Sequence, residues 1–170
     1  MNGLTSALRC ASPVRIVLAT PLGGDIDGAW WPHTGSVAAE LPGLIEALHK
    51  PLGEIVDMRI NWSANEGPPD LNSMGYTSSM PGSRGKRQRL MVVSGRNGCA
   101  KLLVIPHMTA PALGLMLLRR AAAMHIPDGQ QTTQVFLTAD SVVRAAQVES
   151  ASWATQAAER SRSRKRLREV

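Results

Sequence analysis

The sequence has little cysteine, few aromatic residues and no long hydrophobic run. Its two cysteines, Cys10 and Cys99, are too few for a disulfide framework or a zinc cluster, so we expect a cytoplasmic protein. No apolar run approaches the ~18 residues that a membrane span needs, and we expect no membrane insertion. Arg9 interrupts the apolar N-terminal stretch, which is therefore a poor signal peptide.

The chain also lacks the common motifs of catalysis and cofactor binding. It has no Gly-x-Ser-x-Gly, no Gly-x-Gly-x-x-Gly before a helix and no Walker pattern. Its four histidines are scattered and have no ligand-type partner four residues away, so we expect no metal. We therefore expect a non-enzymatic protein with no catalytic residues and no cofactor. An enzyme using Asp27 or His33 is the least supported alternative, because no nucleophile accompanies them.

Although aromatic residues make up only 4% of the chain, two of its four tryptophans are adjacent, within Asp27-Gly28-Ala29-Trp30-Trp31-Pro32. Adjacent residues of an extended segment point to opposite sides. We therefore expect one indole to anchor the core and the other to be exposed on a loop. The candidate platform for a ligand or partner consists of Trp30, Trp31, Trp62, Asp27 and His33. Asp27 has a purely structural alternative, which is to cap its own turn beside Gly28.

Hydrophobic periodicity predicts an α+β fold. Apolar spacings of three and four predict a helix from Val37, and another is expected at residues 112–125. Val56, Met58, Ile60 and Trp62 alternate with polar residues, as in a half-buried strand. Asn97-Gly98 indicates a hairpin between residues 87–93 and 100–105. We expect a small mixed, largely antiparallel sheet of three or four strands, with two or three helices packed on one side.

Composition divides the chain into four parts. We expect a flexible N-terminus at 1–12 and a single α+β domain at 13–127, with a variable loop at about 63–85. A linker and a C-terminal helix follow at 128–158, for which Thr138-Ala139-Asp140-Ser141 is a candidate cap. Residues 159–170 form a basic tail, which we expect to be disordered by itself.

The net charge of +6 comes mainly from this tail, and the remainder of the chain is nearly neutral. A cluster of cations in a segment with almost nothing to bury is suited to sequence-independent contact with phosphates. A solubilising tail is the alternative. The second basic cluster, at Arg84–Arg89, also has a structural alternative, which is a solvated strand face. The candidate nucleic-acid residues are Arg84, Lys86, Arg87, Arg89, Arg160, Arg162, Arg164, Lys165, Arg166 and Arg168.

Residues 15–123 resemble an actinobacterial domain family of unknown function. The resemblance is carried by the Asp27–Pro32 motif, by Glu40-Leu41-Pro42 near a helix start, by Asn61-Trp62 after a strand, and by Val104-Ile105-Pro106. It implies an actinobacterial source, such as a mycobacterium, and brings no catalytic residues with it. The loop around Ser73–Gly85 and the Arg-Ser tail depart from the family pattern.

Two functions remain open from the sequence. The first is a cytoplasmic binding or regulatory module of unknown ligand, which presents the Trp-Trp loop to a partner. We expect that partner to be a protein. The alternative is a nucleic-acid-associated protein that contacts RNA or DNA phosphates through the tail and Arg84–Arg89.

Overall fold

The computed structural model describes residues 13–63, 65–73 and 87–168. The expectations for the N-terminus at 1–12, for most of the variable loop, and for Arg84 and Lys86 concern residues outside these ranges.

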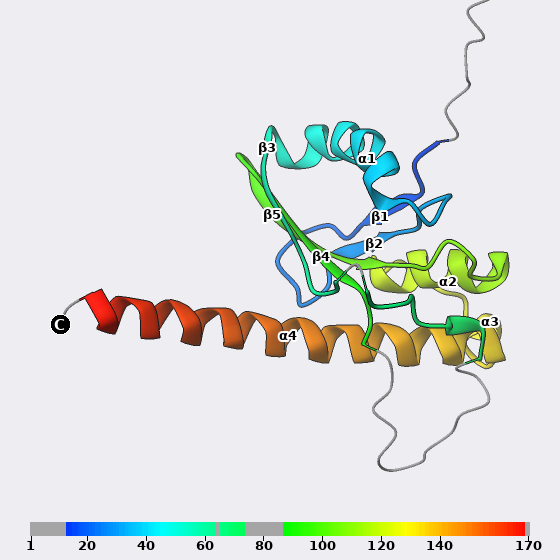
Figure 1. Ribbon diagram of the computed structural model, residues 1–170. Helices are drawn as coiled ribbons and strands as arrows, with labels where there is room; N and C mark the ends of the chain where they lie inside the picture. Colours follow the sequence, from blue (N-terminus) through cyan, green and yellow to red (C-terminus); the bar gives the residue numbers. More distant parts are fainter. Residues whose placement is uncertain (1–12, 64, 74–86, 169–170) are drawn as a thin grey trace, which may run out of the picture.

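A five-stranded sheet in the order β1-β2-β5-β4-β3 forms the centre of the described part of the chain (Figure 1). β2 and β5 are parallel, and the other three neighbouring pairs are antiparallel. The expected α+β class and largely antiparallel sheet are thereby confirmed. The strands are β1 Ile16–Leu18, β2 Gly28–Trp30, β3 Ile55–Ile60, β4 Leu90–Gly95 and β5 Gly98–Val104.

The hairpin expected at Asn97-Gly98 joins β4 to β5. Gly95 pairs with Gly98, so Arg96 and Asn97 form a two-residue turn. The turn therefore lies one residue earlier than the Asn97-Gly98 dipeptide that indicated it, and Gly98 is the first residue of β5.

The strand count differs from the expected three or four because the Trp-Trp segment is itself a strand. β2 inserts between β1 and β5, with Trp30 opposite Ile16 on one side and Val104 on the other. Glycine and proline flank the motif and favoured a loop, but pairing on both sides satisfies the backbone groups of β2 as a buried central strand.

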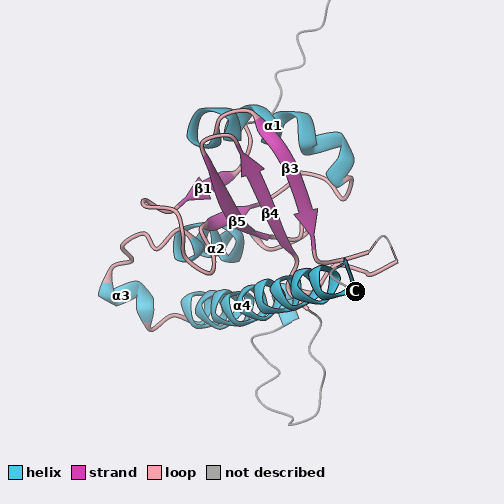
Figure 2. Ribbon diagram, turned by 90° about the vertical axis from the view of Figure 1, so that its left-hand side faces the viewer, coloured by secondary structure: helices cyan, strands magenta, loops and turns pink. Residues whose placement is uncertain are grey.

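Helices cover both faces of the sheet, and the expectation that they pack on one side is wrong. α1 (Val37–Leu52) lies on one face, whereas α2 (Pro111–Ala121) and α4 (Gln134–Arg168) lie on the other (Figures 1 and 2). A short helix, α3 (Asp128–Gln131), precedes α4. Two separate clusters of buried apolar side chains result, one on each side of the sheet.

α1 begins at Val37, as the apolar spacing predicts. The Ser36 hydroxyl accepts a hydrogen bond from the Ala39 amide, and Leu44, Leu48 and Leu52 form the buried stripe. Gly53 ends the helix with φ of +73°, a conformation that favours glycine.

α4 begins earlier and ends later than expected. Its first turn follows Thr133, whose hydroxyl accepts from the Phe136 amide, so the expected cap at Thr138–Ser141 lies inside the helix. Ala139, Val142, Val143 and Ala146 are buried against the sheet and α2, which makes this helix part of the domain core. Contrary to the expected disorder, the basic segment continues the same helix to Arg168.

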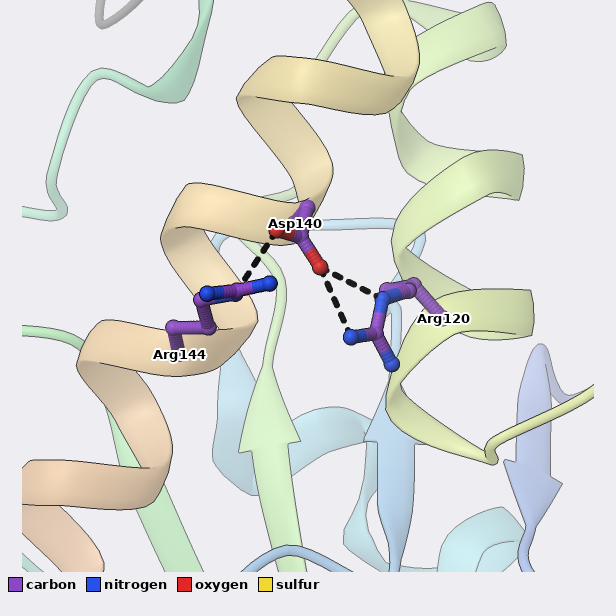
Figure 3. Close-up of polar contacts among 3 residues, drawn as sticks. All are labelled: Arg120, Asp140 and Arg144. Atoms are coloured by element: carbon purple, nitrogen blue, oxygen red, sulfur yellow. Dashed lines mark hydrogen bonds and ion pairs between the residues drawn. The ribbon is translucent and has the colours of Figure 1, made fainter. Parts of the chain in front are cut away.

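Asp140 joins α4 to α2 (Figure 3). Its Oδ1 accepts hydrogen bonds from Nε and Nη2 of Arg120 on α2, both at 2.7 Å. Its Oδ2 pairs with Arg144 Nε one turn along α4, also at 2.7 Å. This carboxylate therefore ties α4 to α2 through charge-assisted hydrogen bonds.

Candidate functional site

The Asp27–Pro32 motif has a structural role at each of its first two positions. The Asp27 carboxylate is buried and accepts backbone hydrogen bonds from Gly23, Gly24 and Lys101, at 2.7, 2.9 and 2.9 Å. A Cβ on Gly28 would lie 2.0 Å from the Val17 carbonyl oxygen of β1, so no side chain fits there. The alternative in which Asp27 caps its own loop therefore agrees with the structure.

Both tryptophans of the motif are buried, at 1% and 4% exposure. Trp30 packs into the cluster under α1, and Trp31 packs into the cluster under α2 and α4. Their side chains diverge as expected, but each face of the sheet has its own core. The expectation of one exposed indole platform is therefore wrong.

The other two proposed platform residues are His33 and Trp62. His33 is exposed, and its Nε2 lies 2.9 Å from the Pro13 carbonyl oxygen. Trp62 follows β3 and packs partly against the cluster under α1, where the Arg89 guanidinium lies 5.2 Å from its ring centre.

A different feature, a groove along α4, is the candidate site that the structure offers. The helix face that packs on the sheet carries apolar residues up to Ala146, then the buried Ser150, then the partly buried Trp153. The same face continues at helical spacing with Ala157, Arg160, Arg164 and Arg168. This face is therefore buried and mostly apolar before Trp153 and carries cations after Ala157. The end of the helix extends past the sheet (Figure 1).

Three adjoining cavities share Trp153, and we call them together the α4 groove. Their volumes are about 420, 130 and 380 Å³. The first cavity is also lined by Trp62, Arg87 and Glu149, and the third is also lined by Arg59 and Arg164.

The opposite wall of the groove is the sheet, which also changes character. Along β5, Leu103 is buried in the core, whereas Lys101 and Cys99, on the same face, line the middle cavity. Arg59 of β3 lines the middle and the third cavity and pairs with Asp57 at 3.5 Å. At this level the middle cavity separates the helix from the sheet.

Charge is unevenly distributed along the groove. Glu66 and Glu149 lie at the Trp62 end, whereas the charged residues of the third cavity are all cations, namely Arg59, Arg160 and Arg164. Burial raises the pKa of Glu149 and outweighs the opposing effects of the Gln88 amide and the charge of Arg87. Glu149 Oε1 accepts from the Gln88 amide at 3.3 Å.

Comparison with known proteins assigns the sheet and two of its helices to a family. A family of unknown function, DUF5994, matches residues 15–121. The chain belongs to the DUF5994 family. No curated protein and no solved structure matches the chain significantly.

The α4 groove of this DUF5994 member is built from two sources. Arg59, Arg87 and Lys101 belong to the matched region, whereas Trp153, Arg160 and Arg164 lie on α4, beyond it. The Trp-Trp motif lies within the matched region and holds its two cores together. The motif therefore has a structural role in the matched region, whereas the groove also needs the C-terminal helix.

The structure brings together only part of the nucleic-acid candidates. Arg87, Arg160 and Arg164 line the groove, while Arg89 covers Trp62 and donates to the Glu66 carbonyl at 2.7 Å. Sequence reasoning missed Arg59, Lys101, Glu149 and Trp153 as site residues. The spacing of Trp153, Ala157, Arg160 and Arg164 was the available signal, but only in a helix that continues into the tail.

Two negative findings complete the site. Within the described ranges, no helix is long and apolar enough to cross a membrane. The same residues contain no group of three histidine, cysteine or acidic side chains placed to hold a metal ion.

Proposed function

We propose that this DUF5994 member is a cytoplasmic, non-enzymatic actinobacterial protein that binds nucleic acid in the α4 groove. Phosphates contact Arg160, Arg164 and Arg168 on one side and Arg59 on the other. The observation that carries the proposal is the arginine row on α4, because it continues the helix face that packs on the sheet.

The electrostatics of this row favour a polyanion. Arg160, Arg164 and Arg168 are exposed and four residues apart, and like charges at this spacing destabilise a helix. Isolated helical segments of this length are marginal in water, so the row needs a compensating charge. A nucleic-acid backbone supplies regularly spaced negative charges and releases counterions on binding.

The alternative of a protein-binding platform loses its main support. It rested on an exposed indole of the Trp-Trp motif, and both indoles are buried. The α4 groove offers cations and two partly exposed tryptophans, Trp62 and Trp153, in its place.

Two triple variants of equal charge test the proposal. R160Q/R164Q/R168Q removes the row that faces the groove, and R162Q/K165Q/R166Q removes three charges from the opposite side of the same helix. We expect the first to weaken binding of a short oligonucleotide about tenfold or more at ~50 mM salt, with a salt slope that is shallower by about 0.7 for each phosphate that is no longer bound. The second should bind nearly as the parent does.

The readout is a salt titration by fluorescence anisotropy with single-stranded and duplex oligonucleotides. Deleting residues 160–170 should remove most of the salt dependence and leave the melting temperature nearly unchanged, since the described side chains of that stretch are exposed. Absence of binding by the full chain to either oligonucleotide at low salt would overturn the proposal. Equal losses of affinity for the two triple variants would overturn the assignment to the groove.

A further inference from the structure

We infer that the α4 groove takes single-stranded nucleic acid, with one base stacked on the indole of Trp153 in the cavity between α4 and the sheet. This inference rests on the proposed function and names the class of nucleic acid.

Trp153 is the tryptophan that runs through the whole groove. All four tryptophans lie in the described ranges, and Trp30 and Trp31 are buried in the two cores. Trp62 is partly buried and lines the first of the three cavities, and the Arg89 guanidinium lies 5.2 Å from its ring centre. Trp153 is partly buried and lines all three cavities of the groove. Stacking on an aromatic side chain is the sequence-tolerant way in which proteins hold unpaired bases.

The middle cavity suits one planar ring. Its volume is about 130 Å³, well below the roughly 300–1,000 Å³ of pockets that enclose drug-sized ligands. Val92, Ala154 and Ala157 give it apolar walls, and the two alanines leave the space beside the indole open. Arg59 and Lys101 also line it, so a base can enter while its phosphates remain near cations.

A duplex does not meet these requirements. Its bases are paired and stacked within the helix, so a base reaches a cavity of this size only after it is flipped out. The third cavity next to it, lined by Arg160 and Arg164, then takes the phosphates on the far side of the stacked base.

The first test compares a single strand of about twelve nucleotides with a duplex of the same length on the full chain, at ~50 mM salt. We expect the single strand to bind at least about fivefold more tightly. Trp153→Leu should lower the affinity for the single strand about tenfold, whereas Trp153→Phe, which retains a stacking face, should lower it no more than about threefold. Circular dichroism and melting temperature establish that each variant is folded.

A second pair of variants leaves the indole in place. Ala157→Leu fills the middle cavity and should weaken single-strand binding, while Ala158→Leu, on the outer side of the helix, should not. In a Cys10→Ser background, Cys99 on the wall of the cavity reports occupancy directly, because a bound base should slow its reaction with iodoacetamide.

The outcomes separate this inference from the proposed function. If neither oligonucleotide binds at low salt, the proposed function itself fails. If binding depends on the groove-facing arginines, but duplex binds as tightly as single strand and Trp153→Leu is unchanged, the stacking inference is wrong and the proposed function stands. Equally tight binding of polyglutamate would show that the groove recognises charge alone, and would also overturn the inference.

Discussion

At the scale of single residues, the Trp-Trp motif is an anchor for two cores. Trp31 lies against Gly114 of α2, where an added Cβ would come within 2.4 Å of the indole. Arg15 also contacts Trp31. Its guanidinium lies 3.7 Å from the Trp31 ring centre, and its Nε donates a hydrogen bond to the Trp31 carbonyl at 3.0 Å. Trp30 packs with Leu44 and Leu48 of α1 on the opposite face. One short strand therefore connects both helical layers to the sheet.

We predict that Trp30→Ala and Trp31→Ala destabilise the fold by similar amounts, about 3–5 kcal/mol each, because each empties a buried aromatic site. Chemical denaturation of the two variants gives both free energies of unfolding. His33→Ala is the control, since its exposed ring contributes to neither core. A large loss of stability for one tryptophan and a loss below about 1 kcal/mol for the other would contradict the two-core arrangement.

At the scale of elements, α4 has two parts with different physical support. Its first half is held by buried alanine and valine side chains and by the Asp140 carboxylate. Its second half has exposed side chains apart from the partly buried Trp153 and Ala157. The helix is continuous, and its first half provides most of its packing against the domain, to which Trp153 adds from the second half.

We predict that Asp140→Ala costs about 1.5–3 kcal/mol, because Arg120 loses both charge-assisted hydrogen bonds in a partly buried position. Arg144→Ala should cost less than about 0.5 kcal/mol, since the side chain of Arg144 is 71% exposed. Thermal or urea unfolding of the two variants measures the difference. Equal costs would show that the contact between α2 and α4 does not depend on this carboxylate.

At the scale of the whole molecule, the acidic end of the α4 groove couples stability to pH. Burial raises the pKa of Glu149 above its ordinary value of 4.5, so between the two pKa values the folded protein binds more protons than the unfolded chain. The contribution of Glu149 to stability is fully present below its pKa in the unfolded chain. It is lost as the pH rises through its pKa in the folded protein. At neutral pH the protein therefore carries the cost of a partly buried charge.

We predict that Glu149→Gln raises the melting temperature at pH 7 and leaves it nearly unchanged near pH 4, where Glu149 is protonated in both states. The amide oxygen of glutamine can still accept from the Gln88 backbone, so the hydrogen bond is retained. Melting curves of both proteins between pH 4 and pH 8 provide the measurement. A difference that does not change with pH would show that the charge of Glu149 is not the cause.

Local patterns predicted much of the element structure. The apolar spacing of α1, its Ser36 cap and its Gly53 end are all short-range features, as is the hairpin at Asn97. The alternation expected along β3 holds only in part. A register shift between Ile55 and Asp57 puts Ile55 with Met58 on the core side and leaves Val56 62% exposed.

The sequence by itself determined the hairpin and α1, because each depends on neighbours within a few positions along the chain, and the periodicity of its segments predicted the α+β class. The structural role of Asp27 was one of two alternatives, and it depends partly on the Lys101 amide, 74 positions away. Only the tertiary structure decided that helices cover both faces of the sheet, and therefore that both tryptophans are buried. It also decided where the α4 groove lies, because Arg59, Lys101 and Trp153 come from segments far apart in the chain. Burial and proximity are properties of packed elements, and no local pattern contains them.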